Sequence, residues 1–271
     1  MEKRKKGQIR AAAESLLKKV EEIVFPEGIY CLACGAVIDR ARPYSLCDGC
    51  LSRFHFAVGR TCTKCGKLLE EGYRHERCRD CRTYERAFDR GYSCMLYGLH
   101  EKEMIRAFKY KNRAYYARPL SELMYDRIEP LIGAEIRADL VCPVPMHRSK
   151  VLRRGYNQAE LLARGVAERM ELPMRRLLCR TRRTVPMSRL SGMQRRENLK
   201  DAVVMAPGME QIATGRNILL VDDIFTSGST ADACAKVLKQ AGCGTVTVLC
   251  LASGGNYGAE SDECDGHSEE Q

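Results

Sequence analysis

The spacing of apolar and polar positions predicts alternating strands and helices in the C-terminal two thirds of the chain. Residues 140–144, 218–221 and 245–251 are short apolar runs, as expected of strands that are covered on both faces. Residues 157–169 carry their apolar positions on one helical face, and another helix is predicted over residues 229–240. The order strand, helix, strand from residue 218 to 251 predicts a right-handed βαβ unit. The expected fold class is therefore α/β, a parallel sheet with helices on both faces.

Further regular segments precede this unit. Two strands are predicted at residues 92–99 and 177–178, and two helices at residues 101–109 and 120–132. Residues 8–25 also have helical spacing and are closed by Pro26 and Gly28.

Changes of composition divide the chain into four regions. An N-terminal helix is expected within residues 1–28 and a cysteine-paired module over residues 29–85, where long apolar runs are missing. The α/β domain is expected over residues 90–252. Residues 253–271 carry six acidic residues and no Lys or Arg, and we expect a disordered acidic tail there.

The chain shows no membrane or export signal in its sequence. No window approaches the apolar run of about 20 residues that a membrane-spanning helix needs. The basic residues 3–6 resemble the start of a signal peptide, but charged residues follow where an apolar region would be needed. We therefore expect a cytoplasmic protein without membrane insertion.

The positive charge is concentrated in one block. The chain has a formal net charge of +10, and residues 147–200 alone contain 15 Lys and Arg against four Glu. A block this dense favours a polyanionic partner, either phosphorylated small molecules or nucleic acid. The alternative is a solvated basic surface.

Eight of the 15 cysteines form a duplicated pattern of C-x-x-C pairs. The spacing within each set of four is identical, and the second set follows the first at an offset of 31 residues. Four thiolates complete the closed tetrahedral site of structural zinc, so two zinc ions are expected, whereas redox C-x-x-C chemistry normally uses one pair. The duplication favours sequential pairing over an exchange of knuckles. The proposed ligands are Cys31, Cys34, Cys47 and Cys50 in the first set and Cys62, Cys65, Cys78 and Cys81 in the second.

A second candidate site follows the apolar run 218–221. Hydroxyls and a glycine at the start of the next helix suit a phosphate, because main-chain N–H groups and the helix dipole favour an anion there. Two carboxylates before them suit sugar hydroxyls, or magnesium through water. Together these features predict a site for a ribose 5-phosphate moiety; the alternative is that Asp223 and Thr226 only cap the helix. The residues concerned are Asp222, Asp223, Thr226, Ser227, Gly228, Ser229 and Thr230.

These residues resemble the signature for phosphoribosyl pyrophosphate (PRPP) of the type I phosphoribosyltransferases. With four further segments, the chain more closely resembles the competence protein F (ComF) family over nearly its whole length. The family pattern implies a type I phosphoribosyltransferase-like sheet preceded by a small N-terminal double zinc ribbon. The additional segments are residues 31–81, 104–111, 143–147 and 153–159.

The resemblance also implies a function. It implies a role in natural transformation and in the handling of single-stranded DNA, with competence-machinery proteins as partners and with PRPP and magnesium at the signature. In this family pattern, Asp222 and Asp223 contact ribose or magnesium, and residues 226–230 form the 5-phosphate loop. The segment expected to meet pyrophosphate comprises Met146, His147, Arg148, Lys150, Arg153 and Arg154.

Two hypotheses about activity follow. In the first, the protein is a phosphoribosyltransferase whose acceptor and general base the sequence leaves open; Met187 stands where the family has a glutamine, so any role of that amide is in doubt. In the second, it binds single-stranded nucleic acid and the PRPP-type site is regulatory. Stacking platforms would then be Tyr110, Tyr115, Tyr116 and Tyr156, for which core or surface packing is the alternative.

Overall fold

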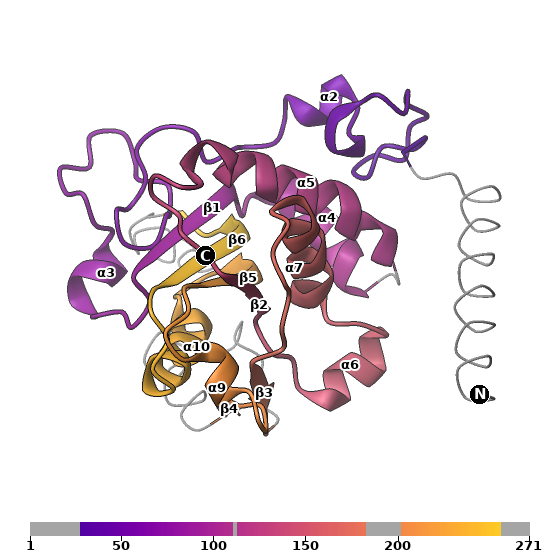
Figure 1. The fold of residues 1–271 in the computed structure, drawn as a ribbon. Helices are drawn as coiled ribbons and strands as arrows, with labels where there is room; N and C mark the ends of the chain where they lie inside the picture. Colours follow the sequence, from indigo (N-terminus) through magenta and orange to yellow (C-terminus); the bar gives the residue numbers. More distant parts are fainter. Residues whose placement is uncertain (1–27, 111–112, 183–201, 256–271) are drawn as a thin grey trace, which may run out of the picture. The chain divides into compact units, whose positions relative to one another are not determined.

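The computed structural model describes residues 28–110, 113–182 and 202–255 (Figure 1). The chain divides into two compact units, Met1–Arg53 and Phe54–Gln271. The boundary separates the first set of four cysteines from the second. The predicted helix over residues 8–25, the segment with Met187 and nearly all of the acidic tail lie outside the described residues.

The described part of the first unit is a small cysteine-bound turn structure. Tyr30 and Val37 form an isolated antiparallel bridge around the first knuckle. The 3-10 helix η1 (Pro43–Ser45) and the helix α2 (Asp48–Leu51) follow it. Few buried apolar side chains support this unit, as expected of a module that depends on metal.

The second unit contains an α/β domain. Its helices are α3 (Arg79–Thr83), α4 (Leu99–Tyr110), α5 (Ala117–Ile128), α6 (Arg148–Arg154), α7 (Gln158–Arg169), α9 (Glu210–Ala213) and α10 (Ser229–Gln240), with the 3-10 turns η2 (Ala114–Tyr116) and η3 (Glu129–Leu131). Its strands are β1 (Arg90–Leu96), β2 (Leu140–Pro143), β3 (Leu178–Arg180), β4 (Val203–Met205), β5 (Ile218–Phe225) and β6 (Val246–Ser253).

Four strands form a parallel sheet in the order β1-β6-β5-β2. Leu219 of β5 lies opposite Val141 of β2 and Thr247 of β6, so β5 is an interior strand. The backbone of residues 173–175 adds a short parallel bridge beyond β2 through Met174 and Val141. Strands β3 and β4 form a separate antiparallel pair.

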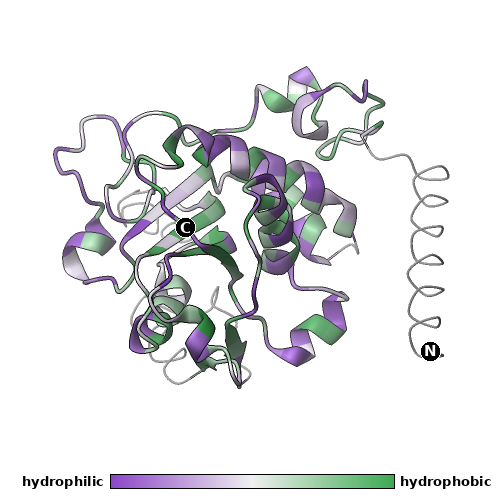
Figure 2. Ribbon diagram, viewed as in Figure 1, coloured by the Kyte–Doolittle hydropathy of each residue, from purple (hydrophilic) through white to green (hydrophobic). Residues whose placement is uncertain are grey.

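Helices cover both faces of the sheet, as predicted. Helices α5 and α7 contact each other and pack on one face, where α7 lies against β2 and β5. Helix α10 packs on the opposite face, where its Cys234 and Leu238 join Leu220 and Val248 in one core. In Figure 2 the central strands are mostly hydrophobic, whereas the helices show hydrophobic and hydrophilic sides. The alternation along β5 explains this pattern, since successive side chains enter opposite cores.

The second set of four cysteines belongs to this α/β unit. All four side chains are buried and join the core that includes α10 and β6. Its knuckle lies directly on β1: a Cβ built on Gly66 would lie 2.4 Å from the carbonyl oxygen of Gly91. Gly66 has a φ of +72°, so a side chain is excluded at this position by the backbone angle and by space.

Most predicted elements are found, with corrections at their ends. The strand expected to end at Val221 continues to Phe225, because β6 pairs with it as far as Ser253. The helix expected to reach Ile132 gives way to a 3-10 turn after Ile128, where Pro130 follows. The strand expected over residues 92–99 runs from Arg90 to Leu96. The α/β fold class is confirmed. In the part of the chain that is described, no helix combines the length and the apolar character needed to cross a bilayer.

Candidate functional site

The sheet topology creates a crevice between the carboxyl ends of β2 and β5. From β2 the chain passes through α7 to residues 173–175 at the outer edge, whereas from β5 it passes through α10 to β6 on the other side. The two helices therefore leave the sheet on opposite faces. Open α/β sheets bind ligands at such a point, outside the carboxyl ends of the strands. The segment after β2 and the predicted ribose-phosphate loop after β5 meet at this point.

The two aspartates lie within the last four residues of β5 and leave it on opposite faces, because side chains alternate along a strand. Asp222 lies on the same face of the strand as Leu220, and Asp223 on the face of Val221. Burial and, next to it, the charge of Asp223 raise the pKa of Asp222 to about 7, although the N–H of Asp223 donates a 2.8 Å hydrogen bond to Asp222 Oδ1. Asp222 is thus a carboxylate whose charge is poorly compensated.

Lys109 at the end of α4 pairs with the second aspartate. Its Nζ lies 2.8 Å from Asp223 Oδ2, and both side chains are largely buried. The sequence singled out the segment 104–111 without giving Lys109 a role. The helical pattern alone could not show that this lysine reaches β5, because the contact depends on how α4 crosses the sheet.

The loop after β5 presents unpaired amides, as an anion site requires. Gly228 is the N-cap residue of α10 and has a φ of +74°, and no side chain caps the helix. The alternative in which Asp223 or Thr226 caps α10 is therefore wrong. The hydroxyls of Ser227 and Ser229 lie 2.9 Å apart. A Cβ built on Gly228 would lie 2.4 Å from the ring of Phe225, so glycine is required where the loop folds over that ring. Of the other two loop residues, Thr226 is exposed and Thr230 is half-buried.

The segment after β2 forms a turn and the short helix α6. The N–H of Val144 donates a 2.9 Å hydrogen bond to the carbonyl of Val221, which ties this segment to β5. His147 caps α6: the N–H of Ser149 donates to its Nδ1 at 3.2 Å. The helix ends at Gly155, whose φ of +86° closes the turn. Of the other predicted pyrophosphate residues, Met146 and Lys150 are half-buried and Arg148 is exposed.

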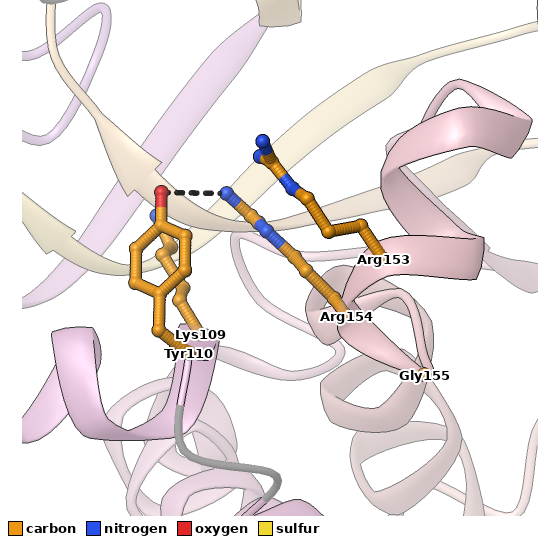
Figure 3. A pocket seen from close by; sticks show the side chains of 5 residues that line it. All are labelled: Lys109, Tyr110, Arg153, Arg154 and Gly155. Carbon is orange, nitrogen blue, oxygen red and sulfur yellow. Dashed lines mark hydrogen bonds between the residues drawn. The ribbon is translucent and has the colours of Figure 1, made fainter.

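A pocket of ≈ 740 Å³ lies between the end of α4 and the end of α6. Figure 3 shows its lining side chains. Arg154 donates a 2.9 Å hydrogen bond to the hydroxyl of Tyr110, and its guanidinium lies 4.7 Å from the centre of that ring. Three cations and one aromatic ring make this a site suited to an anion. The lining residues are Lys109, Tyr110, Arg153, Arg154 and Gly155.

The pocket includes some of the predicted pyrophosphate residues but not others. Arg153 and Arg154 line it, whereas Met146, His147, Arg148 and Lys150 do not. It adjoins the β5 site, because Lys109 lines the pocket and also pairs with Asp223. The sequence interpretation missed Lys109 here and considered Tyr110 only as a stacking platform.

The tyrosines weighed as stacking platforms divide into two groups. Tyr110 and Tyr115 are 60% and 50% exposed. Tyr116 is fully buried against Phe108, so it is a core residue, and the half-buried Tyr156 donates a hydrogen bond to the carbonyl of Phe108. Only the first two could present a ring to a ligand.

Each predicted set of four cysteines converges on a point. Within each set the Sγ atoms all lie within 4.8 Å of one another. The Sγ separations of 3.8 Å for Cys34–Cys47 and 3.6 Å for Cys65–Cys78 match the edge of about 3.8 Å of a tetrahedron with Zn–S bonds near 2.3 Å. Each group takes its two C-x-x-C pairs from one stretch of sequence, so the predicted sequential pairing is confirmed and no pair is exchanged between the two sites. The groups fit structural zinc and leave no position for a catalytic water.

In both sets a backbone N–H donates a hydrogen bond to a cysteine Sγ, which favours the thiolate form. The N–H of Cys47 donates to the Sγ of Cys31 at 3.4 Å, and the N–H of Cys78 donates to the Sγ of Cys62 at 3.2 Å. Hydrogen bonds with the other three thiols of the set lower the pKa of Cys62, and the corresponding hydrogen bonds of Cys65 raise the pKa of that thiol. Four thiols held this closely favour deprotonation by a bound metal.

Comparison with known proteins supports the cysteine module and the wider resemblance. A family model described as "Double zinc ribbon domain" matches residues 20–82. "Competence protein F" of Haemophilus influenzae is 28% identical over 82% of this chain and 96% of its own length. "DNA utilization protein YhgH" of Escherichia coli K12 is 28% identical over 77% and 90%, and "Competence protein ComFC" of Bacillus subtilis is 25% identical over 73% and 79%.

Solved structures that resemble the chain cover about half of it. The "allosteric regulatory enzyme of purine biosynthesis" aligns with a TM-score of 0.35 and 20% identity over 50% of this chain and 26% of that one. A purine phosphoribosyltransferase from Pyrococcus horikoshii aligns with a TM-score of 0.29 and 12% identity over 49% and 70%. These scores are too low to carry an argument about the site. The expected resemblance to the competence protein F family is confirmed by the curated relatives and by the double zinc ribbon.

Proposed function

We propose that the protein binds PRPP with magnesium at the crevice between β2 and β5 and acts in DNA uptake. The single observation that carries the proposal is the junction of three features at one sheet edge: the Asp222–Asp223 pair, the uncapped amides of α10 and the cationic pocket. A ribose that carries a phosphate at one end and pyrophosphate at the other matches this order of groups. The relatives named for competence and DNA utilization support the cellular role.

Each part of PRPP has a proposed partner in the chain. The 5-phosphate would accept hydrogen bonds from the amides and hydroxyls of residues 226–230. The ribose hydroxyls would donate to Asp222 and Asp223. Pyrophosphate would lie in the pocket, where Lys109, Arg153 and Arg154 neutralise its charge, with the segment 146–150 beside it.

Magnesium fits the chemistry of this donor set. Carboxylate oxygens are the protein ligands that Mg²⁺ prefers, often through water. Burial and the charge of Asp223 disfavour the charged form of Asp222 and raise its pKa, and a cation bound beside it would favour the carboxylate again. When bound, magnesium would neutralise the pyrophosphate that leaves. Asp222 and Asp223 are the residues that would hold it.

Phosphoribosyl transfer is the activity that we propose for this site, with an acceptor of unidentified class. Transfer breaks the bond between C1 of the ribose and the pyrophosphate oxygen, and the electron pair leaves on pyrophosphate. An acceptor lone pair forms the new bond to C1, and the acceptor gives its proton to solvent. The chain's own contribution is electrostatic: Lys109, Arg153 and Arg154 stabilise the charge that develops on the departing group.

A second function is favoured by the charge distribution. Residues 147–200 contain 15 basic residues, and Tyr110 and Tyr115 are exposed near the end of α4. These features support binding of single-stranded DNA, with PRPP as a regulatory ligand and without turnover. In either case the two zinc sites would be structural, the protein would act in the cytoplasm and competence proteins would be its partners.

One assay separates the two functions. Pyrophosphate release is measured with PRPP, magnesium and a panel of acceptors that includes nucleobases, ammonia and single-stranded DNA. Release above the rate without acceptor supports transfer. Binding of PRPP without release, together with a salt-sensitive shift of single-stranded DNA, supports the regulatory function.

A further inference from the structure

We propose that Arg86, which follows the second set of four cysteines, positions the phosphate loop of α10 and makes this zinc ribbon part of the ligand site. Arg86 was not among the residues that the sequence analysis identified. The inference rests on the proposed function for the identity of the ligand, but the contacts that carry it lie entirely within the α/β unit.

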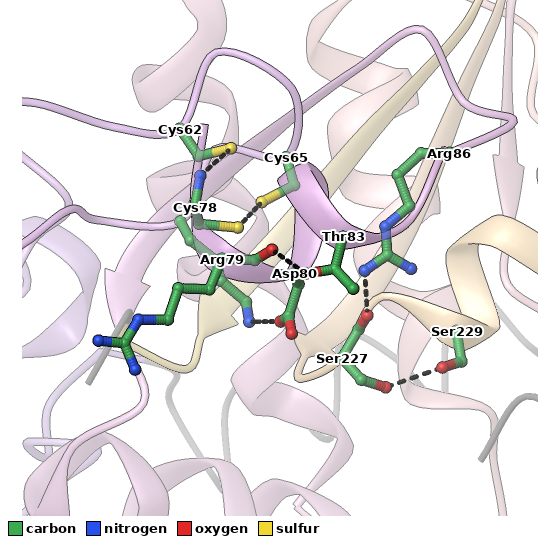
Figure 4. A network of polar contacts seen from close by, with 10 residues as sticks. Cys62, Cys65, Cys78, Arg79, Asp80, Thr83, Arg86, Ser227 and Ser229 are labelled. Atoms are coloured by element: carbon green, nitrogen blue, oxygen red, sulfur yellow. Dashed lines mark hydrogen bonds and ion pairs between the residues drawn. The ribbon is translucent and has the colours of Figure 1, made fainter. Parts of the chain in front are cut away.

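Arg86 contacts the loop through a hydrogen bond that spans 141 positions of sequence. Its Nη2 donates to the carbonyl oxygen of Ser227 at 2.8 Å. The residue is only 5% exposed. Figure 4 shows its guanidinium beside Ser227, with Ser229 following at the start of α10.

This bond fixes the direction of a loop amide. The described peptide bonds are all trans, and a trans peptide holds its C=O and the following N–H on opposite sides. When the carbonyl of Ser227 points to Arg86, the N–H of Gly228 must point to the other side of the loop. Arg86 is therefore a positioning residue: it acts through the Ser227–Gly228 peptide, and the amide that it orients belongs to the predicted phosphate cradle.

The charge of Arg86 supports the same role. Among the described residues, no carboxylate forms an ion pair with Arg86, and its buried Nε has no hydrogen-bond partner. A buried guanidinium without a counter-ion is costly, and a nearby anion would offset that cost. The uncapped helix N-terminus of α10 beside it is the place where such an anion is expected.

The residues next to Arg86 attach it to the same loop and helix. The N–H of Ala87 donates a 2.8 Å hydrogen bond to Oδ1 of the buried Asp232 in α10. The ring of Phe88 packs edge-on against Phe225 at 6.0 Å between centroids, and Phe225 in turn supports Gly228. The segment 86–88 therefore contacts the loop itself, the helix after it and the end of the strand before it.

The zinc ribbon in turn fixes this segment. Lys67, which is buried in the ribbon, donates to Asp80 of α3 at 2.7 Å and lies 5.9 Å from the centre of the Phe225 ring. The cysteines that surround the second metal site share one core with α10. Loss of the metal would release α3 and the segment 86–88 together. The second cysteine group therefore supports the phosphate loop through the segment 86–88.

The test compares Arg86→Met, which keeps an unbranched apolar stem but removes the donors and the charge, with Arg86→Lys, which keeps a donor and the charge. Arg74→Met is the matched control, because Arg74 is an exposed cation of the same ribbon. Affinities for ribose 5-phosphate and for inorganic pyrophosphate are measured by calorimetry, and zinc content and Tm are measured in parallel.

The expected result is selective. Arg86→Met weakens ribose 5-phosphate by about tenfold or more, because a charge-assisted hydrogen bond is lost, and leaves pyrophosphate within twofold. Arg86→Lys recovers part of the affinity, and Arg74→Met behaves as the parent protein. Equal loss of both ligands with loss of zinc would show a purely structural role, and unchanged ribose 5-phosphate affinity would also overturn the inference.

A second measurement needs no ligand and keeps the inference testable if PRPP binding itself fails. Hydrogen exchange is followed in the free protein for the peptide covering residues 229–240, in which the N–H of Asp232 donates a hydrogen bond to the carbonyl of Gly228. Arg86→Met should increase exchange there by about tenfold while Arg74→Met leaves it unchanged. Unchanged exchange in Arg86→Met would overturn the positioning role, whereas failure of the parent protein to bind PRPP or ribose 5-phosphate would overturn only the proposed function.

Discussion

Lys109 at the end of α4 holds its ammonium 2.8 Å from Asp223 at the end of β5, and the same lysine lines the cationic pocket. One side chain therefore connects the carboxylate pair to the proposed pyrophosphate site. A cation that binds Asp223 would compete with Lys109 and direct its ammonium toward the pocket. This relationship makes the ion pair the first feature to test.

The Lys109–Asp223 pair is predicted to stabilise the α/β unit. Lys109→Met leaves a largely buried carboxylate without its partner, so it should lower the free energy of unfolding by about 2–4 kcal/mol. Asp223→Asn should recover part of this loss when it is combined with Lys109→Met. A double-mutant cycle by urea unfolding measures the coupling, expected at about 1–3 kcal/mol. Additive effects would show that the pair contributes nothing.

The raised pKa of Asp222 predicts a pH-dependent cost to stability. Burial and the charge of Asp223 raise its folded pKa to about 7, above its ordinary value. The folded protein binds this proton more tightly than the unfolded chain, so protonated Asp222 stabilises the folded state at pH 4. This stabilisation is lost as the pH rises through the folded pKa near 7. Asp222→Asn should therefore raise Tm at pH 8 by about 3–8 °C and change it little at pH 4–5.

Differential scanning calorimetry of Asp222→Asn across pH 5–8 checks this prediction, and Asp126→Asn on the exposed side of α5 is the control. The same Asp222 variant should lose PRPP binding. A variant that is stabilised at high pH yet binds PRPP normally would separate Asp222 from the site. A loss of stability at pH 8 would contradict its burial as a charged group.

Gly228 is predicted to be essential for the loop. Gly228→Ala places a Cβ 2.4 Å from the Phe225 ring and also strains a backbone with φ +74°. Gly208→Ala is the matched control: Gly208 has φ +75° but no atom within 4 Å of its added Cβ. We expect about 1–2 kcal/mol of destabilisation in the control, from the backbone alone, and at least twice that in Gly228→Ala. Equal effects in chemical denaturation would show that Phe225 can move aside.

The two zinc sites are predicted to contribute differently to stability. Cys65 is buried in the core of the α/β unit, whereas Cys34 is exposed in the first unit. Cys65→Ser should remove one zinc equivalent and lower the midpoint of the main unfolding transition by about 5 °C or more, since structural zinc supplies folding energy. Cys34→Ser should remove one equivalent and leave that transition unchanged. Equal shifts in a calorimetric scan would contradict the assignment of the second ribbon to the α/β unit.

Local sequence patterns predicted the elements that depend on local chemistry. The apolar run before Asp222 and the glycine in the following turn are sufficient to predict the start of β5 and the start of α10, but not the end of β5 at Phe225. The equal spacing in the two sets of cysteines predicts sequential tetrahedral groups, which the structure has. The resemblance added the segment 153–159, of which Arg153 and Arg154 reach the pocket.

The contacts that assemble the site could not be predicted from the sequence. Lys109 reaches Asp223 only because α4 crosses the end of the sheet, and Arg86 reaches Ser227 across 141 positions. The burial of the second ribbon against α10 also depends on tertiary packing: its cysteines looked the same as those of the first ribbon, yet only the second set joins the sheet core. Spacing predicts which ligands share a metal, but it does not predict what packs around them.

Calorimetric titration of the parent protein with PRPP, with and without magnesium, tests the central claim most directly. We expect one PRPP per chain in the presence of magnesium, a loss of affinity of about 30-fold or more in Asp223→Asn, and normal binding in Asp126→Asn, since a charged contact to the ligand is removed only in the first variant. The absence of PRPP binding to zinc-loaded protein, or equal affinity in Asp223→Asn, would contradict the account.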